Sequence, residues 1–119
     1  MADAYLAFLL KRCSRASGKV FVAEIGDAVV GFVGVLAKVP PVEPDEDQTP
    51  YAYISDLVVL PAYRQRGIGL ALLQHAEAFA RSSGASLLRV GVLVKNRVAG
   101  ELYGRMGFTG YQVHLVKRL

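Results

Sequence analysis

The spacing of apolar residues along the first half of the chain predicts a helix followed by three strands. Near the start, apolar residues recur at helical intervals until Gly18 ends the pattern, and these are Leu6, Leu9, Leu10, Cys13 and Ala16. Residues 19–25 and 28–39 are rich in β-branched side chains and flank the turn pair Gly26-Asp27, so they predict a β-hairpin. Residues 51–60 predict a third strand, which Pro61 ends.

The second half alternates between helical and strand patterns. A helical stripe that Gly84 closes is formed by Ile68, Leu72, Ala76, Phe79 and Ala80. Residues 86–94 are almost all apolar, which predicts a central strand. Asn96 begins a short helix that carries Tyr103 and ends at Gly107, and residues 108–119 then predict a hairpin or a bent strand.

This order of elements predicts an α/β (α+β) fold with a mixed sheet covered by helices. No repeat or linker interrupts the chain, so residues 1–119 are expected to form one domain. The only long loop, residues 40–50, contains four prolines together with Glu43, Asp45, Glu46 and Asp47. It is interpreted as a solvated connector, and the alternative is a lip that attracts a cationic substrate.

Composition narrows the function classes. With 53% hydrophobic residues the chain can bury a core, and a net charge of +4 suits an anionic small ligand. Basic residues do not interleave with aromatic ones, so no nucleic-acid partner is expected. A single cysteine fits a reducing compartment, and the apolar runs are too short for a membrane span, so we expect a cytoplasmic protein without a membrane partner. Two histidines and one cysteine show no metal-ligand spacing.

Candidate chemistry is concentrated in the turn Arg64-Gln65-Arg66-Gly67-Ile68-Gly69, which joins a strand to a helix. The first turn of a helix presents unpaired N–H groups and a partial positive charge. Glycines let a phosphate approach these groups, and arginines add charged donors. The turn therefore predicts a pyrophosphate cradle. It lacks the lysine and hydroxyl of a nucleoside-triphosphate loop, and Leu72 stands where a dinucleotide fingerprint needs its third glycine.

At these residues the chain resembles the GCN5-related N-acetyltransferase (GNAT) superfamily. The resemblance rests on Arg64-x-x-Gly67-x-Gly69 after a strand that ends at Pro61, and on Asn96, Leu102-Tyr103 and Gly107-Phe108 downstream. It runs in order from about residue 19 to the end of the chain. It implies a mainly antiparallel sheet with splayed central strands and acetyl-CoA as the donor.

The resemblance also implies where acetyl-CoA binds. The pyrophosphate would lie on the backbone of the glycine turn, and the pantetheine arm would bond main-chain groups of the preceding strand, as an added strand does. The implied binding residues are Leu57, Val58, Val59, Arg64, Gln65, Arg66, Gly67, Ile68, Gly69, Leu70 and Asn96. A helix N-cap is an equally good interpretation of Asn96.

The implied reaction is direct transfer of the acetyl group to a primary amine, for which a proton acceptor and a proton donor are needed. The resemblance makes Tyr103 the acid beside the leaving sulfur, and the alternative is a tyrosine of the core. A backbone N–H near Val59 is the candidate for stabilising the oxyanion.

Candidates for the general base lie on the strand of residues 51–60. Strand alternation places Tyr51, Tyr53, Ser55 and Leu57 on one face, and Ile54, Asp56 and Val58 on the other. Relatives carry a glutamate at positions that match Tyr53, Ser55 or Gly91, and none of these is a carboxylate here. We therefore expect a water relay through Tyr53 or Ser55, with Asp56 as the weaker candidate.

Two further expectations follow from the departures from the family pattern. The missing carboxylate favours, as the alternative function, a non-catalytic CoA-binding or regulatory module. Relatives begin with a further strand and helix, so the N-terminus looks shortened. A sheet edge left free in this way, together with the alternating last residues, predicts a possible homodimer. The acceptor stays open between a small molecule and a peptide amine.

Overall fold

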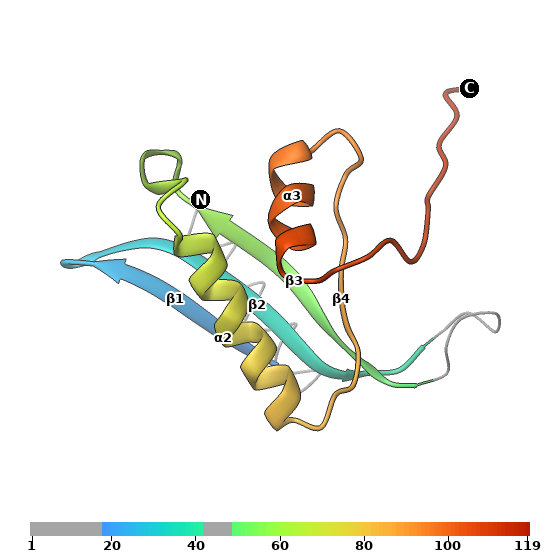
Figure 1. Cartoon of the computed structure of the whole chain (residues 1–119), viewed down its shortest axis with the longest axis horizontal. Helices are drawn as coiled ribbons and strands as arrows, with labels where there is room; N and C mark the ends of the chain where they lie inside the picture. The colour runs from blue at the N-terminus through green and yellow to red at the C-terminus, as the bar shows by residue number, and fades with distance from the viewer. Residues whose placement is uncertain (1–17, 42–48) are drawn as a thin grey trace.

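A computed structural model describes residues 18–41 and 49–119 of the chain. The elements in order are β1 (Lys19–Ile25), β2 (Ala28–Val39), β3 (Tyr51–Val59), the 3-10 turn η1 (Pro61–Tyr63), α2 (Ile68–Ser82), β4 (Leu88–Val90) and α3 (Arg97–Arg105) (Figure 1). The helix expected before Gly18 and most of the expected loop 40–50 lie outside the described residues.

The described strands form one sheet in the order β1-β2-β3-β4. β1 and β2 pair antiparallel across the predicted Gly26-Asp27 turn, where Gly26 has a φ of 62° that favours glycine. β2 and β3 are also antiparallel, whereas β3 and β4 are parallel. The mixed, mainly antiparallel sheet expected from the sequence is confirmed.

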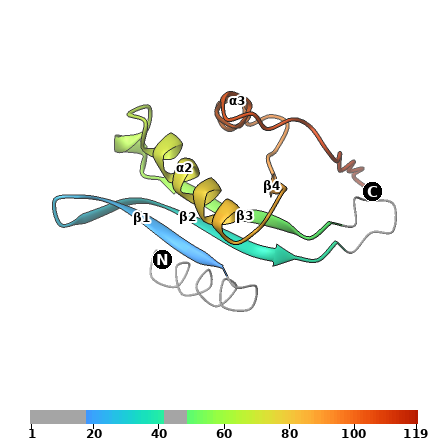
Figure 2. The same ribbon diagram turned by 60° about the horizontal axis from the view of Figure 1, so that its bottom comes forward.

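Both described helices lie on the same face of the sheet, as Figure 2 shows. α2 buries one stripe against the sheet, which consists of Leu72, Leu73, Ala76 and Ala80. All of this stripe except Ala80 meets Val33, Val35 and Ile54 of the strands in a single core cluster that also includes Tyr103 of α3. Burying a leucine of this kind contributes about 1.5–3 kcal/mol. The core therefore fixes α2 and α3 relative to β3, which carries most of the predicted site.

β3 contains a bulge at Ser55. Asp56 is the register partner of Gly34 and Ile54 is the partner of Val35, so Ser55 has no partner on β2. An extra residue reverses the alternation of the side chains that follow it. Leu57 consequently packs against the same core cluster as Ile54. The strict alternation that placed Leu57 with Tyr53 was therefore wrong beyond the bulge.

The prediction for residues 86–94 was only partly right. A strand forms over Leu88–Val90 alone, and it is the edge of the described sheet, not its centre. Its pairing with β3 stops at Ile54 and Val90, so the two strands diverge there, as expected from the splayed pattern. The apolar run continues into Val92, Leu93 and Val94, which are exposed. Periodicity alone cannot distinguish a buried strand from such an exposed apolar run.

The hairpin or bent strand expected for residues 108–119 does not form. These residues adopt no regular structure, and those from 109 onward are exposed. The alternating sequence is suited to a strand, but a strand also needs a neighbouring edge with which to pair. The expectation is therefore wrong for this segment as it stands in the single chain.

Candidate functional site

The divergence of β3 and β4 opens a groove of about 330 Å³. Its walls come from the second half of β3, from the chain after β4 and from one side of α3. The lining residues are Ile54, Ser55, Asp56, Leu57, Val90, Gly91, Val92, Leu93, Asn96, Ala99 and Tyr103. Three of the four predicted catalytic residues thus meet in one groove, and Tyr53 is the exception.

Tyr103 is both a core residue and a wall of the groove. Its side chain is 9% exposed, and its ring packs edge-on against Phe108 with 5.6 Å between ring centroids. Burial raises the pKa of the Tyr103 phenol, and the nearby Tyr53 raises it further. The phenol therefore keeps its proton at neutral pH and has that proton to donate inside the groove.

Ser55 presents a buried hydroxyl to the groove. Its Oγ has no hydrogen-bond partner among the described residues. A buried polar atom without a partner costs about 1–3 kcal/mol, so the position is suited to a bound molecule or water that completes the bonding. The bulge causes this arrangement, because it removes Ser55 from the regular pairing with β2.

Asp56 lies on a different face of β3 from the one that the sequence predicted. Neighbouring strand residues point to opposite faces, so Asp56 lies opposite Leu57, on the face of Tyr53. The prediction that Asp56 faces away from Tyr53 was therefore wrong, again because of the bulge. Burial raises the pKa of the Asp56 carboxyl above its ordinary value of 3.8. A higher pKa makes this carboxylate a better proton acceptor.

Tyr53 lies at the edge of the groove, beside Gly91. Its hydroxyl is 3.5 Å from the point that a Cβ on Gly91 would occupy. Its ring contacts that of Tyr51, with 6.5 Å between centroids, so the predicted common face of these two tyrosines is correct. Gly91 was not predicted as a site residue by itself. A glycine inside an apolar strand pattern is the signal that could have identified it.

The glycine turn has the open backbone that was expected. Gly67 caps α2 with a φ of +83°, and no atom lies within 4 Å of the position a Cβ would take there. The first helical bond runs from the Ala71 N–H to the Gly67 carbonyl at 3.0 Å. The N–H groups of Ile68, Gly69 and Leu70 therefore have no partner within the helix, and no side chain caps them. Such an end is suited to an anion.

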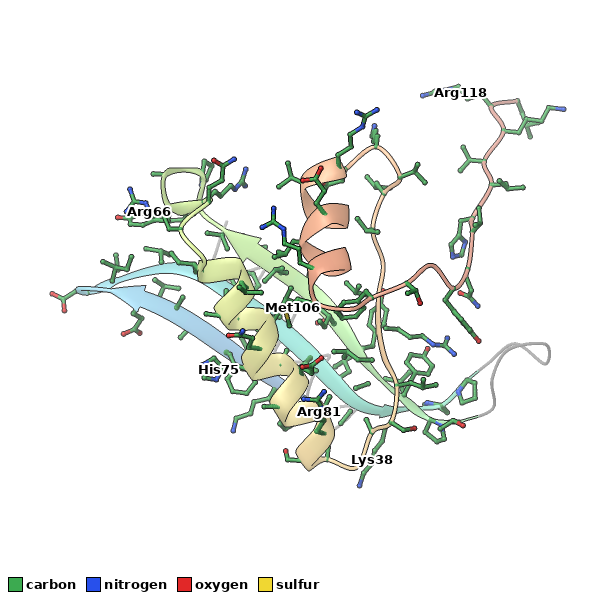
Figure 3. All side chains as sticks on the ribbon, in the orientation of Figure 1. Lys38, Arg66, His75, Arg81, Met106 and Arg118 are labelled. Carbon is green, nitrogen blue, oxygen red and sulfur yellow. The ribbon has the colours of Figure 1, made fainter. Side chains whose placement is uncertain are left out.

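The two arginines of the turn are held in place. The Arg64 Nε donates to the Val59 carbonyl at 2.9 Å, which ties the turn to the end of β3. The Arg66 guanidinium lies 5.3 Å from the centroid of the Tyr63 ring. Figure 3 shows that Arg66 projects from the turn, well apart from His75 and Arg81 farther along α2. Both cations therefore add positive charge at the N-terminal end of α2.

Two residues predicted to contact the cofactor also have structural roles. A Cβ on Gly69 would lie at ordinary contact distances of 3.4 Å from Leu102 and 3.9 Å from Val59, so Gly69 marks the place where α2 packs on α3 and β3. The Asn96 side chain caps α3 by accepting from the Ala99 N–H at 3.2 Å. Asn96 nevertheless lines the groove, so its N-cap role and a place at the site are compatible.

Residues 2–108 match the family model of the acetyltransferase (GNAT) family. The chain belongs to this family. It is 33% identical over 121 residues to an uncharacterized N-acetyltransferase of Methanocaldococcus jannaschii, covering 97% of this chain and 50% of that protein. The chain thus spans about half the length of this relative.

Solved structures of the GNAT fold agree with this assignment. A putative acetyltransferase from Pyrococcus furiosus is 26% identical, with a TM-score of 0.79 over 99% of this chain and 76% of that one. AAC(6')-Iy in complex with the bisubstrate analogue CoA-S-monomethyl-acetylneamine also gives 0.79, over 98% of this chain and 79% of the other. Its identity is 21%, so this second likeness shows the fold alone.

Two classes of site were also sought in residues 18–41 and 49–119. No group of three or more His, Cys, Asp or Glu side chains is placed there to hold a metal ion. None of the helices in this part of the GNAT domain has the length and apolar character needed to cross a membrane.

Proposed function

We propose that the chain carries an N-acetyltransferase domain that moves an acetyl group from acetyl-CoA directly to a primary amine. One observation carries the proposal. The diverging strands create a groove that contains Tyr103 and the unpartnered Ser55 hydroxyl, and β3 leads from this groove to the open N-terminal end of α2. A long ligand with a phosphate at one end and a reactive group at the other suits this arrangement.

The described residues fit acetyl-CoA. The free N–H groups at Ile68, Gly69 and Leu70 would hold the pyrophosphate, with Gln65, Gly67 and the charges of Arg64 and Arg66 around it. Leu57, Val58 and Val59 would bond the pantetheine amides, because this part of β3 has no register partner on β4. Asn96 lies on the far wall of the same groove.

When bound, acetyl-CoA supplies a thioester whose carbonyl carbon the amine attacks, and a CoA thiolate leaves. Tyr103 would donate its proton to the departing sulfur, and its raised pKa keeps the phenol protonated at neutral pH until then. A backbone N–H of β3 near Val59 would donate to the oxyanion. These groups are held by the core and the sheet, so they need little rearrangement during the reaction.

The proton released by the attacking amine needs a route out of the groove. We assign it to a water relay that the hydroxyls of Ser55 and Tyr53 hold, with Asp56 as the carboxylate that accepts the proton. The buried, unpartnered Ser55 Oγ and the raised pKa of Asp56 support this assignment. The position of Asp56 on the face of Tyr53 makes it a stronger candidate than its place in the sequence suggested.

The second candidate function is a CoA-binding module without turnover. The observation that favours it is the absence of a glutamate at Tyr53, Ser55 and Gly91. Both candidates predict CoA binding, and only an acetyltransferase releases free CoA when an amine is added.

Thiol release from acetyl-CoA, measured against a panel of amines, tests the proposal. The names of matched relatives suggest the panel: streptothricin, thialysine and an aminoalkylphosphonate, with a polyamine and a peptide N-terminus added. We expect amine-dependent thiol release with at least one of them. Tight CoA binding with no release on the whole panel would instead support the module.

A further inference from the structure

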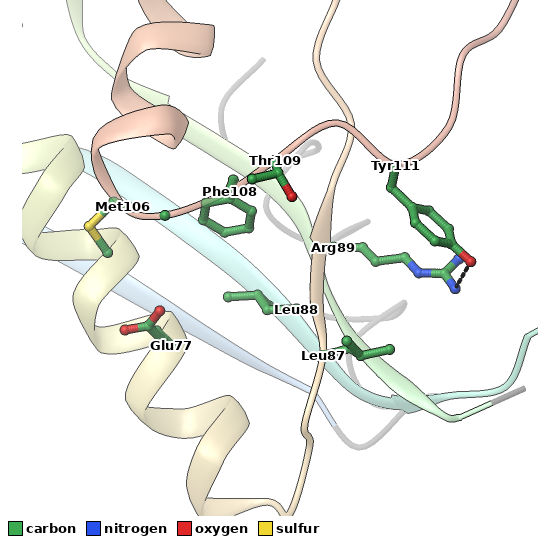
Figure 4. A pocket seen from close by; sticks show the side chains of 9 residues that line it. Glu77, Leu87, Leu88, Arg89, Met106, Phe108, Thr109 and Tyr111 are labelled. Atoms are coloured by element: carbon green, nitrogen blue, oxygen red, sulfur yellow. Dashed lines mark hydrogen bonds between the residues drawn. The ribbon is translucent and has the colours of Figure 1, made fainter. Parts of the chain in front are cut away.

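An arginine of β4 lies against two tyrosine rings. The Arg89 guanidinium is 3.7 Å from the centroid of the Tyr51 ring and 4.6 Å from that of the Tyr111 ring. Figure 4 shows Arg89 extending from β4 toward Tyr111, whose hydroxyl accepts a hydrogen bond from it at 3.4 Å. Two rings packed on one guanidinium limit its movement, so the direction of its N–H groups is largely fixed.

Arg89 points to the face of the sheet that is opposite to α2 and α3. Its neighbours in β4, Leu88 and Val90, pack against the core cluster beneath the helices. Neighbouring strand residues point to opposite faces, so Arg89 points away from that core. Tyr53 shares the face of Arg89, because the two are register partners in parallel strands. Both side chains are half-buried, so solvent reaches them.

The groove between β3 and β4 reaches this face at Gly91. Gly91 lines the groove, and the Tyr53 hydroxyl lies 3.5 Å from the point that a Cβ on Gly91 would occupy. Asp56 lines the same groove and lies on the face of Tyr53, beyond the bulge. Along β3 this face therefore has a cation beside Tyr51 at one end and a carboxyl group at the other.

We propose that the acceptor of this domain is a primary amine that carries a carboxylate at the far end of a short aliphatic chain. The proposal rests on the proposed function and names its substrate class. Arg89 would bind the carboxylate, and the amine would enter the groove at Gly91, on the side of Asp56. Arg89 and Gly91 are two residues apart, which is about 7 Å along a strand, and the aliphatic chain would cover this span.

The charges on this face favour a carboxylate over a second amine. A guanidinium has several N–H donors in a planar fork that matches a carboxylate, and it can serve more than one acceptor at once. Tyrosine rings can also bind an ammonium group, but Arg89 already lies over the rings of Tyr51 and Tyr111. A second ammonium group would therefore meet a like charge. The acceptor would contact Arg89 and not Tyr111, whose ring only packs against the guanidinium.

Thiol release from acetyl-CoA with three matched amines tests the substrate class. 6-Aminohexanoate, hexylamine and 1,6-diaminohexane have the same chain length and the same reacting amine, and they differ in the group at the far end. We expect kcat/KM for 6-aminohexanoate to exceed that for each of the other two by about tenfold or more, the scale of a charge-assisted hydrogen bond.

Variants of Arg89 test whether this residue is the source of the preference. In Arg89→Gln, kcat/KM for 6-aminohexanoate should fall by about tenfold or more, mainly through KM, while that for hexylamine stays at the wild-type value. Arg89→Lys keeps the charge without the fork and should give an intermediate ratio of the two amines. Arg81→Gln removes the same charge at an exposed position of α2 and should leave the ratio unchanged.

Two kinetic results would overturn the carboxylate site. Equal kcat/KM values for the three amines in the wild type would show that no carboxylate is recognised. An equal loss with all three amines in Arg89→Gln and in Arg89→Lys would show that Arg89 supports the fold alone. The ratio of two amines is measured within one protein, so a smaller folded fraction of a variant does not affect it.

A binding measurement separates this proposal from the proposed function. Calorimetric titration of 6-aminohexanoate into the protein with excess CoA needs no turnover. Saturable binding that Arg89→Gln weakens by about tenfold, without thiol release from any amine, would support the carboxylate site and contradict the acetyltransferase. Thiol release from hexylamine, without any binding of 6-aminohexanoate, would support the acetyltransferase and contradict the carboxylate site.

Discussion

Tyr103 combines two roles that usually compete. Its ring belongs to the core cluster and packs on Phe108, while its position on α3 brings it to the wall of the groove. Burial alone would indicate only a packing role for Tyr103. The proposed acid role rests on its position beside a groove that contains an unpartnered hydroxyl. The two roles can be separated by removing only the oxygen.

Tyr103→Phe keeps the ring and deletes the hydroxyl. We expect turnover to fall by about 10²-fold or more, the scale of a lost general acid, with the melting temperature and CoA affinity nearly unchanged. Tyr111→Phe makes the same chemical change outside the groove and should keep full turnover. A Tyr103→Phe enzyme that works at the wild-type rate would leave this tyrosine with a packing role only.

Asp56 should make stability depend on pH in a predictable direction. Its folded pKa is raised above 3.8 by burial, so the folded chain holds this proton more tightly than the unfolded chain. The carboxyl group therefore lowers the free energy of unfolding as pH rises from about 3.8 through the folded pKa. Above that pKa, the charged form is a net cost to the fold.

Asp56→Asn removes this cost. We expect the variant to be more stable than the wild type at pH 7, and slower in amine-dependent thiol release if Asp56 accepts the proton. Glu101→Gln, at an exposed position on α3, is the control and should change neither property. Chemical unfolding between pH 3 and 8 provides the measurement. A loss of stability at pH 7 would show that Asp56 is stabilised in its charged form.

Between elements, the end of β3 depends on close contact with β2. A Cβ on Gly31 would lie 2.8 Å from the Val58 carbonyl oxygen, a backbone atom that cannot move without shifting the strand. Gly31→Ala should therefore destabilise the fold by about 1–3 kcal/mol, the usual cost of overpacking, and weaken CoA binding. Gly100→Ala meets no atom within 4 Å and should stabilise α3 by up to about 1 kcal/mol. Thermal unfolding of the two variants, and the CoA affinity of Gly31→Ala, would show whether β3 is held this tightly.

The elements that local sequence determines were predicted well. The Gly26-Asp27 hairpin, the stripe of α2 and the Asn96 cap of α3 each depend on residues a few positions apart, so their patterns are readable in the chain itself. The bulge at Ser55 is different, because it arises from the register between β3 and β2. No residue type in the sequence indicates this bulge. The bulge reversed the expected orientations of Leu57 and Asp56.

The same distinction explains the errors at the far edge of the sheet. Residues 86–94 and 108–119 have strand-like sequences, but whether a strand forms depends on which edge is available to pair. Residues 108–119 form no strand in the described structure, although their sequence is suited to one.

Across the whole molecule, one continuous path links the features of the site. It begins at the open N-terminus of α2, follows β3 where that strand leaves β4, and ends at Tyr103. Arg64 joins the first two parts through its bond to the Val59 carbonyl. The central claim is that CoA binds along this path, with its pyrophosphate at Gly67.

Calorimetric titration of CoA into wild type, Gly67→Ala and Gly84→Ala tests this claim most directly. Gly67 and Gly84 stand at the two ends of α2 with φ values of +83° and +88°, and neither meets an atom within 4 Å. An alanine should therefore strain both sites equally. We predict at least about tenfold weaker binding for Gly67→Ala, because the added methyl keeps the pyrophosphate from the N–H groups, and wild-type affinity for Gly84→Ala. Equal affinity in all three folded proteins would contradict the account.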